Sequence, residues 1–460
     1  MRLALKAKAT LKPKRTLKLK VKTQAKAKVK TKVKAEVKAK VKTKVKGKVK
    51  TGVKARVKPR YKARVKARAN QTTHTQLGPK LKAKSKIKGK TKPKTKPKTK
   101  LKTKLKTNLK RVLSDAIIAK RFHSQLLSWF DVNGRHDLPW QRERTFYRVW
   151  VSEIMLQQTQ VSTVIGYFAR FMHAFPSVTH LARAPLDEVL ALWSGLGYYA
   201  RARHLHQAAA RIVNEQQGEF PRTRAGWQQL PGVGASTAGA IVAQVLNQRE
   251  PILDGNVKRV IARAFALALT GQAFIEACWA YVERITPTQR PADFTQAIMD
   301  LGATVCTRSR PACERCPIQP VCRAHADKQT SMYPLKTAKP VKKTYAKTWC
   351  YLHTNEQVYL RQRAPNGVWG GLWELVEFAS AAELKAWVNQ HLKHHAANLS
   401  ALAPIEHVFT HMVWRISCYR LKLTTPLALP HLAGEWVSRQ ELAKRGLPAP
   451  VLKLLNLDYT

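Results

Sequence analysis

The chain has 460 residues and a formal net charge of +59 at neutral pH, from 85 Lys and Arg against 26 Asp and Glu. Residues 1–110 hold 38 Lys, six Arg and one Glu, and so contribute +43 of that total. The rest of the chain is long enough for two domains of ordinary size. It contains no long uninterrupted apolar stretch, which argues against a membrane span.

Residues 1–112 form a lysine-rich segment of low complexity. Lysine alternates with Ala, Val, Thr or Leu along most of it, and Tyr61 is its only aromatic residue. Repulsion between lysines at every second position opposes a strand, and so little apolar surface cannot offset the entropy lost on ordering. We therefore expect disorder. The segment would bind DNA phosphates non-specifically and in a salt-dependent way, and a dispensable solubilising extension is an equally good interpretation.

Helical periodicity begins just after this segment. Ser114 suits a helix N-cap, and apolar residues recur at helical spacing from Ile118 until the pair Asn133-Gly134 ends the helix. The pattern stays helical as far as Cys322, with Gly and Pro between the apolar runs and no hairpin signal. Residues 113–322 are therefore predicted to form one mainly helical domain.

The segment VWVSEIMLQQ carries a carboxylate among apolar neighbours. In a helix, Glu153 has Val149 and Trp150 one turn before it, and Leu156 and Gln157 one turn after it. A carboxylate held on such a face has a raised pKa, which suits a general acid. A position on a solvated helix face is the plainer alternative.

The motif LPGVGAS, residues 230–236, puts two glycines in a tight turn that leads directly into the apolar run STAGAIVAQVL. Free backbone amides at the start of a helix bind anions, and small residues let a phosphate approach. The motif resembles the loop of a helix-hairpin-helix, which grips a DNA backbone without reading its sequence; a plain glycine turn is the alternative. About twenty residues later, PILDGNVKR puts Asp254 where it suits the cap of another helix.

Four cysteines lie close together near the end of the helical pattern: Cys306, Cys313, Cys316 and Cys322. Their spacing, C-x6-C-x2-C-x5-C, contains a single C-x2-C pair. Structural zinc sites usually use two such pairs, so a cubane iron–sulfur cluster is the better fit and zinc is the alternative. Thiolate ligation also implies a reducing compartment.

Residues 323–345 are polar and basic, and they are predicted to be a linker. The pattern then changes. WCYLHTNEQVYLRQR predicts a hairpin that turns at Asn355-Glu356, AAELKAWVNQHL predicts a helix, and GGLWELVEF and RISCYRLKL predict further strands. Residues 346–460 are therefore predicted to form an α+β domain.

The glycine loop, the aspartate and the four-cysteine loop, in this order, resemble the helix-hairpin-helix DNA glycosylases of the endonuclease III superfamily. Finer matches are similar to the MutY-type adenine DNA glycosylases: LPWQ, SEIMLQQTQV, GLGYYARAR, PILDGNVKR, MDLGATVCTRS and a C-terminal FTH. The resemblance covers about residues 114–460 and leaves the lysine-rich segment outside. It implies a mainly α helix-hairpin-helix domain with a [4Fe-4S] cluster loop, followed by an α+β Nudix-like domain.

The resemblance also implies an activity, namely monofunctional hydrolysis of the N-glycosidic bond of adenine paired with 8-oxoguanine or guanine, leaving an abasic site. Glu153 matches the glutamate that protonates adenine at N7, and Asp254 matches the aspartate that stabilises the oxocarbenium-like cation. Ser236 stands where bifunctional relatives have a lysine nucleophile, so no Schiff base is expected. Asn256 and Gln296 match residues that position the catalytic groups and the adenine.

Other residues match DNA contacts of the family. Gln158 and Tyr198 match side chains that wedge into the base stack beside 8-oxoguanine. The C-terminal FTH departs from the family's Phe-Ser-His signature, because threonine keeps the hydroxyl but adds a methyl group. The implied positions are Gln158, Thr159, Leu196, Tyr198, Phe409, Thr410 and His411 for the lesion, and Leu230, Gly232, Val233, Gly234, Arg308 and Arg310 for the DNA backbone.

We therefore expect a monomer with one [4Fe-4S] cluster, acting on double-stranded DNA with A:8-oxoguanine or A:guanine mispairs, without a membrane partner. A bacterial, cytoplasmic, nucleoid-associated location is expected. The C-terminal segment lacks an acidic pyrophosphatase box, so no nucleotide hydrolysis is expected. Two other functions compete: a DNA-binding protein that acts through its lysine-rich segment, disfavoured by the pair Glu153 and Asp254, and a pyrimidine-lesion glycosylase with lyase activity, disfavoured by Ser236.

Overall fold

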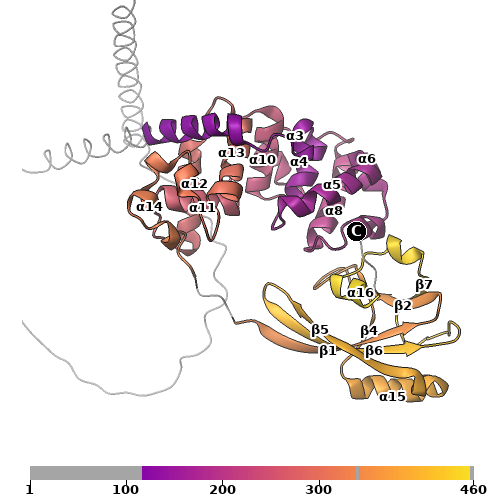
Figure 1. The fold of residues 1–460 in the computed structure, drawn as a ribbon. Helices are drawn as coiled ribbons and strands as arrows, with labels where there is room; N and C mark the ends of the chain where they lie inside the picture. Colours follow the sequence, from indigo (N-terminus) through magenta and orange to yellow (C-terminus); the bar gives the residue numbers. More distant parts are fainter. Residues whose placement is uncertain (1–116, 338–340, 456–460) are drawn as a thin grey trace, which may run out of the picture. The chain divides into compact units, whose positions relative to one another are not determined.

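The structure is a computed structural model that describes residues 117–337 and 341–455 (Figure 1). The predicted cap Ser114 and the lysine-rich segment 1–112 lie outside the described residues. Within them, no helix is long and apolar enough to cross a membrane.

The first part of the described chain is helical, as the sequence predicts. A helix over residues 117–133 comes first. It is followed by α3 (Pro139–Arg142), α4 (Phe146–Met155), α5 (Val161–Ala174), α6 (Val178–Arg183), α7 (Leu186–Leu192), α8 (Ala200–Glu215), α9 (Arg224–Trp227), α10 (Ala235–Leu246), α11 (Gly255–Ala264), α12 (Gly271–Ile285), α13 (Pro291–Asp300), the π-helical turn η1 (Leu301–Val305), the 3-10 turns η2 (Cys313–Arg315) and η3 (Gln319–Val321), α14 (Arg323–Ala326) and the 3-10 turn η4 (Thr330–Met332).

Helix α10 connects the two hydrophobic clusters of this helical part. Ile241 and Val242 belong to a cluster built by α4 to α10, whereas Ala240 belongs to a second cluster built by the 117–133 helix and α10 to α13. The helix is rich in Ala and Gly, which permits close packing. A Cβ on Gly239 would lie 2.9 Å from the carbonyl oxygen of Pro251. Because α10 packs against both α4 and α13, side chains from three helices meet around it.

Arg201 in α8 ties together two loops of the helical part. Its side chain is buried, and its guanidinium lies over the rings of Trp193 and Tyr198. The loops contain Gln158 and Tyr198, whose φ angles of 60° and 50° are uncommon for non-glycine residues. The guanidinium donates hydrogen bonds to the carbonyl oxygens of Ile154 (3.0 Å), Met155 (2.7 Å), Gln157 (2.6 Å), Leu196 (3.3 Å) and Gly197 (3.0 Å) and to Thr159 Oγ1 (3.1 Å).

The C-terminal part is an α+β domain, as predicted. Its strands form a sheet of order β3-β2-β1-β6-β5, in which β4 also pairs with β1 and β7 with β2. Strands β1 and β6 are parallel and every other pair is antiparallel. The elements are β1 (Lys343–His353), β2 (Gln357–Gln362), β3 (Trp373–Glu374), β4 (Val376–Phe378), α15 (Ala381–His391), η5 (Lys393–Asn398), β5 (Leu399–Val408), β6 (Met412–Lys422), β7 (Glu435–Ser438), η6 (Glu441–Lys444) and α16 (Ala449–Leu454).

Alternating residues of β1 face opposite sides of this sheet. Trp349 and Tyr351 pack in the cluster that includes α16, whereas Cys350 and Leu352 pack in the cluster that includes α15. This period of two is the expected pattern for a strand covered on both faces. The hairpin predicted at Asn355-Glu356 is confirmed, because β1 and β2 flank that pair and run antiparallel.

Replacing Arg201 by methionine tests its structural role. Arg201→Met keeps an unbranched apolar stem but leaves buried carbonyl oxygens without a donor, so we expect the free energy of unfolding to fall by about 3 kcal/mol. Urea denaturation measures this. Arg170→Met, at an exposed position on α5, is the matched control and should change stability by less than about 0.5 kcal/mol. Equal losses in the two variants would contradict the assignment.

Candidate active site

Helices α4, α10, α11 and α13 surround an open cavity of about 820 Å³ in the helical part of the chain. The cavity brings together all four predicted catalytic residues, the predicted adenine-pocket residue and three of the predicted DNA contacts. These are Glu153, Ser236, Asp254 and Asn256, then Gln296, and then Gln158, Thr159 and Arg308.

Glu153 projects from α4 into this cavity and is half-buried. Its Oε1 accepts a hydrogen bond from Gln244 Nε2 at 3.0 Å. Burial raises the pKa of Glu153 to about 7, and the negative charge of Asp254 adds to the rise, while the hydrogen bond from Gln244 opposes it. The expectation of a raised pKa is thereby confirmed. A carboxyl with this pKa exchanges its proton near neutral pH.

Asp254 caps the N-terminus of α11, as the sequence predicts. Its Oδ1 accepts from the backbone amide of Val257 at 2.7 Å, and its Oδ2 accepts from Asn256 Nδ2 at 3.2 Å. The pKa of Asp254 is raised, because burial raises it by more than these amide donors and the positive charge of Arg259 lower it. Asp254 therefore has more support for its ionised form than Glu153 has.

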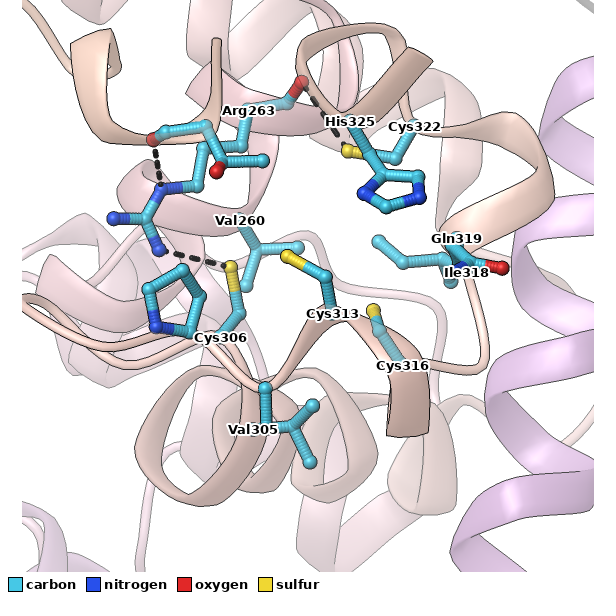
Figure 2. Close-up of a pocket in the computed structure, with 13 residues that line it drawn as sticks. Val260, Arg263, Val305, Cys306, Cys313, Cys316, Ile318, Gln319, Cys322 and His325 are labelled. Atoms are coloured by element: carbon cyan, nitrogen blue, oxygen red, sulfur yellow. Dashed lines mark hydrogen bonds between the residues drawn. The ribbon is translucent and has the colours of Figure 1, made fainter. Parts of the chain in front are cut away.

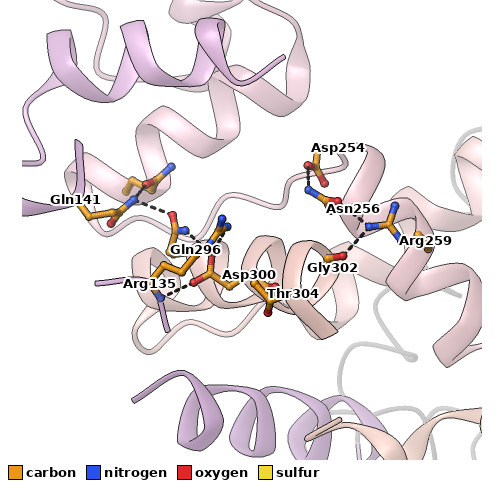
Figure 3. A network of polar contacts seen from close by, with 10 residues as sticks. Arg135, Gln141, Asp254, Asn256, Arg259, Gln296, Asp300, Gly302 and Thr304 are labelled. Atoms are coloured by element: carbon orange, nitrogen blue, oxygen red, sulfur yellow. Dashed lines mark hydrogen bonds and ion pairs between the residues drawn. The ribbon is translucent and has the colours of Figure 1, made fainter. Parts of the chain in front are cut away.

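Asn256 links Asp254 to Arg259 (Figure 3). The guanidinium of Arg259 donates to Asn256 Oδ1 at 2.8 Å and to the carbonyl oxygens of Gly302 at 2.6 Å and Cys306 at 2.7 Å. These contacts hold the start of α11 against η1 and the first cysteine of the four-cysteine loop.

Ser236 uses its hydroxyl to hold the segment that leads to Asp254. Its Oγ accepts a hydrogen bond from the backbone amide of Leu253 at 3.0 Å. Ser236 therefore lies at the wall of the cavity, with its oxygen engaged in positioning the backbone next to the aspartate.

The loop before α10 has the geometry expected of a helix-hairpin-helix turn. Gly232 has a φ of 76°, and a Cβ there would lie 2.7 Å from His204 Cβ, so both conformation and space favour glycine. Gly234 is the N-cap of α10 and offers no side chain to the first amides of the helix. Leu230 and Val233 are buried and anchor the loop in the hydrophobic cluster that contains Ile241 and Val242.

The four cysteines of the C-x6-C-x2-C-x5-C loop line one cavity, with Val260, Val305 and Ile318 among the other lining side chains (Figure 2). Arg263 Nη1 donates to Cys306 Sγ at 3.3 Å. Burial raises the pKa of Cys316 to about 12 and also raises the pKa values of Cys313 and Cys322. Among residues 117–337 and 341–455, no three or more Cys, His, Asp or Glu side chains are grouped closely enough to hold a single metal ion. Four thiols around one cavity with an apolar wall are a donor set that suits a cluster.

Comparison with known proteins identifies the family. The family model described as "HhH-GPD superfamily base excision DNA repair protein" matches residues 151–284, and the family model described as "NUDIX domain" matches residues 348–457. The adenine DNA glycosylase of Buchnera aphidicola subsp. Acyrthosiphon pisum is 37% identical over 350 residues, which is 74% of this chain and 98% of that protein. The chain belongs to the adenine DNA glycosylase family. The predicted resemblance, fold class and enzyme class are thereby confirmed.

Other relatives are similar to this member of the adenine DNA glycosylase family. The Homo sapiens adenine DNA glycosylase is 32% identical over 409 residues, covering 73% of each chain. A solved structure of a thermostable thymine-DNA glycosylase is 27% identical, with a TM-score of 0.42, and covers 46% of this chain and 97% of its own.

The remaining predicted DNA contacts of this adenine DNA glycosylase lie outside the cavity lined by Glu153 and Asp254. Leu196 and Tyr198 lie in the loop held by Arg201, where Leu196 is buried and Tyr198 is 45% exposed. Arg310 is exposed beyond Cys306. In the α+β domain, Phe409 packs against Trp369, His407 and Trp414, while Thr410 and His411 are exposed at the turn between β5 and β6.

Sequence reasoning missed a set of buried polar residues beside Glu153. Gln244 is 3% exposed and touches the Glu153 carboxyl, and Gln141, Asp300 and Arg135 continue the contacts away from it. One signal was available, because Gln244 interrupts the apolar run AIVAQVL on a helix whose neighbouring positions are buried.

The raised pKa of Glu153 predicts a pH-dependent stability. The folded chain binds this proton more tightly than the unfolded chain does. As pH rises from about 4.5 to about 7, Glu153 therefore lowers the free energy of unfolding by a growing amount. We expect Glu153→Gln to raise the free energy of unfolding by about 2 kcal/mol at pH 8, below the full linkage value because the side chain lines an open cavity. At pH 5 the gain should shrink to about a quarter.

Urea denaturation of parent and variant at the two pH values measures this difference. Glu143→Gln is the control, because the Glu143 side chain is 73% exposed, and it should behave alike at both values. A gain from Glu153→Gln that is the same at pH 5 and pH 8 would argue against a raised pKa.

Proposed function

We propose that this chain hydrolyses the N-glycosidic bond of adenine that is mispaired with 8-oxoguanine or guanine in double-stranded DNA, and that it leaves an abasic site. The observation that carries this proposal is a pair of carboxylates, Glu153 and Asp254, lining one cavity with different hydrogen-bond environments. Hydrolysis of a glycosidic bond uses one carboxyl as an acid and another as an anion.

Glu153 acts as the general acid in this proposal. Its pKa of about 7 keeps the proton available near neutral pH. The Oε–H bond breaks as an N–H bond forms at N7 of adenine, so the base takes the electrons of the glycosidic bond and leaves as a neutral molecule.

Asp254 acts as the anion that stabilises the cation left on the sugar. Burial raises the pKa of Asp254, and the amide of Val257, the charge of Arg259 and the side chain of Asn256 oppose that rise by stabilising the ionised form. Its role as helix cap fixes the carboxylate in place, so one residue serves both the fold and the chemistry. Water then forms a bond from its oxygen to C1′ of the sugar and gives its proton to the Glu153 carboxylate, which completes the hydrolysis and restores the acid.

Base removal without strand cleavage follows from the chemistry of the cavity wall. A Schiff base needs an amine nucleophile. Ser236 supplies a hydroxyl that is engaged with the Leu253 amide, and no lysine is among the described residues that line this cavity.

The same enzyme would recognise the mispair through two groups of side chains. Gln158, Thr159, Leu196 and Tyr198 belong to the loops clamped by Arg201, which suits side chains that wedge into a base stack. Phe409, Thr410 and His411 would contact 8-oxoguanine, since the aromatic packing of Phe409 leaves the polar groups of its two neighbours exposed. Gly232, Gly234, Arg308 and Arg310 would contact phosphates, with Leu230 and Val233 anchoring the glycine loop.

One [4Fe-4S] cluster held by Cys306, Cys313, Cys316 and Cys322 completes the proposal. When bound, it would supply four irons for these thiolates to ligate and so would cross-link the loop that contains Arg308 and Arg310, and it would offer no acid or base to the reaction. The lysine-rich segment, outside the described residues, would bind DNA phosphates non-specifically. A monomer in a bacterial cytoplasm, associated with the nucleoid, remains our prediction.

Metal analysis of the purified chain tests the cluster. We expect about four iron and four sulfide per chain with a broad visible absorbance, because each of the four thiolates ligates one iron of a cubane. Cys316→Ser should lower both contents, while Cys350→Ser, at a buried cysteine in the α+β domain, should leave them unchanged. A stoichiometric zinc content without iron would replace the cluster by the zinc alternative.

Single-turnover cleavage of duplexes tests the reaction. With adenine opposite 8-oxoguanine, we expect base release that becomes visible as strand breaks only after alkali. Glu153→Gln and Asp254→Asn should each lower the rate by on the order of 100-fold or more, and the exposed Glu143→Gln should not. Wild-type rates in both carboxylate variants would refute the proposed activity. Efficient borohydride trapping would refute only the monofunctional mechanism, and equal rates opposite 8-oxoguanine, guanine and thymine would refute only the mispair preference.

A further inference from the structure

A continuous line of buried hydrogen bonds ends on the carboxyl of Glu153. Gln244 Nε2 donates to Glu153 Oε1 at 3.0 Å, and Gln244 Oε1 accepts from Gln141 Nε2 at 2.7 Å. The same Gln141 Nε2 donates to Gln296 Oε1 at 2.7 Å, and Gln296 Nε2 donates to Asp300 Oδ1 at 2.7 Å. Figure 3 shows Gln141, Gln296, Asp300 and Arg135 in this arrangement.

Asp300, at the end of this line opposite Glu153, determines which atom of each side-chain amide, oxygen or nitrogen, faces each neighbour. Asp300 is fully buried and pairs with Arg135 through Nε at 2.9 Å, Nη2 at 2.6 Å and the backbone amide at 2.8 Å. An ionised carboxylate only accepts hydrogen bonds, so Gln296 must turn its Nε2 toward Asp300 and its Oε1 toward Gln141.

The orientation of the Gln141 amide in turn determines that of the Gln244 amide. Its Nε2 has two hydrogens and donates one to Gln296 and one to Gln244. The reverse orientation of Gln141 would set its oxygen against the oxygen of Gln296. The orientation observed leaves Gln141 Oε1 buried without a hydrogen-bond partner among the described residues, which is unfavourable by itself. The two hydrogen bonds to Gln296 and Gln244 favour this orientation, and Gln244 then presents its Nε2 to Glu153.

From this arrangement we propose that Gln244 is a positioning residue for the general acid, which engages Oε1 of Glu153 as an acceptor and leaves Oε2 as the oxygen that carries the transferable proton. This inference rests on the proposed role of Glu153. Gln244 touches neither adenine nor sugar in this account and acts only through the carboxyl.

The hydrogen bond from Gln244 also favours proton release. A donor binds a carboxylate more strongly than a neutral carboxyl, so the Gln244 contact strengthens as the Oε2–H bond breaks and the negative charge forms. It therefore lowers the pKa of Glu153 against the opposing effects of burial and of Asp254. The other charged groups that line this cavity are Arg135, Arg259 and Arg308.

Methionine at position 244 tests the proposal, because it matches the length and unbranched shape of glutamine but donates no hydrogen bond. The measurement is the pH dependence of the single-turnover rate of adenine release. In the parent chain the rate should fall as Glu153 ionises above about pH 7. In Gln244→Met we expect this alkaline limb to move up by about one pH unit, and the maximal rate to fall about tenfold. Affinity for the duplex should stay within about twofold.

A second variant tests the line of amides behind Gln244. Gln141→Met removes the donor that orients Gln244, so the limb should move in the same direction by an equal or smaller amount. The double variant should go no further than Gln244→Met alone, because both changes act through one hydrogen bond. Gln207→Met, at an exposed position on α8, is the control and should reproduce the parent profile.

The outcomes separate this inference from the proposed function. Unmoved limbs in both Gln244→Met and Gln141→Met, with Glu153→Gln inactive, would overturn the positioning role and leave the general acid intact. A loss of rate without movement of the limb would also overturn it, since that result marks a purely structural effect. Full activity in Glu153→Gln would instead refute the general acid itself. If Gln244→Met does not fold, Gln141→Met decides the question by the same criteria.

Discussion

The burial of one carboxyl, that of Glu153, is the constraint on which the rest of the active site depends. Burial beside Asp254 raises the pKa of Glu153 to about 7, so the group can hold and release a proton at neutral pH. Ionisation of this buried group lowers the stability of the fold above about pH 4.5, and Glu153 lies in a region where α10 packs against α4 and α13. The two hydrophobic clusters that meet at α10 hold the helices that carry Glu153 and Gln244.

The two carboxylates of the cavity owe their different environments to local structure. Glu153 lies in the last turn of α4, where the backbone amides are already paired within the helix, and it receives one side-chain donor. Asp254 lies at the first turn of α11, where free amides stabilise an anion. The proposed acid and the proposed anion thus differ through the positions of two similar side chains on their helices. The four-cysteine loop reaches this cavity in two ways: Arg308 is one of the lining residues, and Arg259 contacts both the Cys306 carbonyl and Asn256.

The sequence predicted the features that depend on neighbours along the chain. The cap at Asp254, the glycine loop before α10, the four-cysteine spacing and the Asn355-Glu356 hairpin are local patterns, and periodicity revealed Glu153 on an apolar helix face. The glutamine line escaped because its members are separated by up to 155 residues and meet only in the folded chain. For the same reason, the parallel pairing of β1 with β6 was not predicted, and the role of Arg201 was visible only from its six hydrogen-bond partners.

Direct titration of Glu153 tests the central claim, that burial gives this carboxyl a proton to donate near neutral pH. Carbon-13 labelling of the glutamate carboxyls and NMR spectra recorded from pH 4 to pH 9 would follow each group, and the signal absent from Glu153→Gln assigns Glu153. The account predicts a midpoint near pH 7. A midpoint near 4.5, the ordinary value for an exposed glutamate, would contradict it.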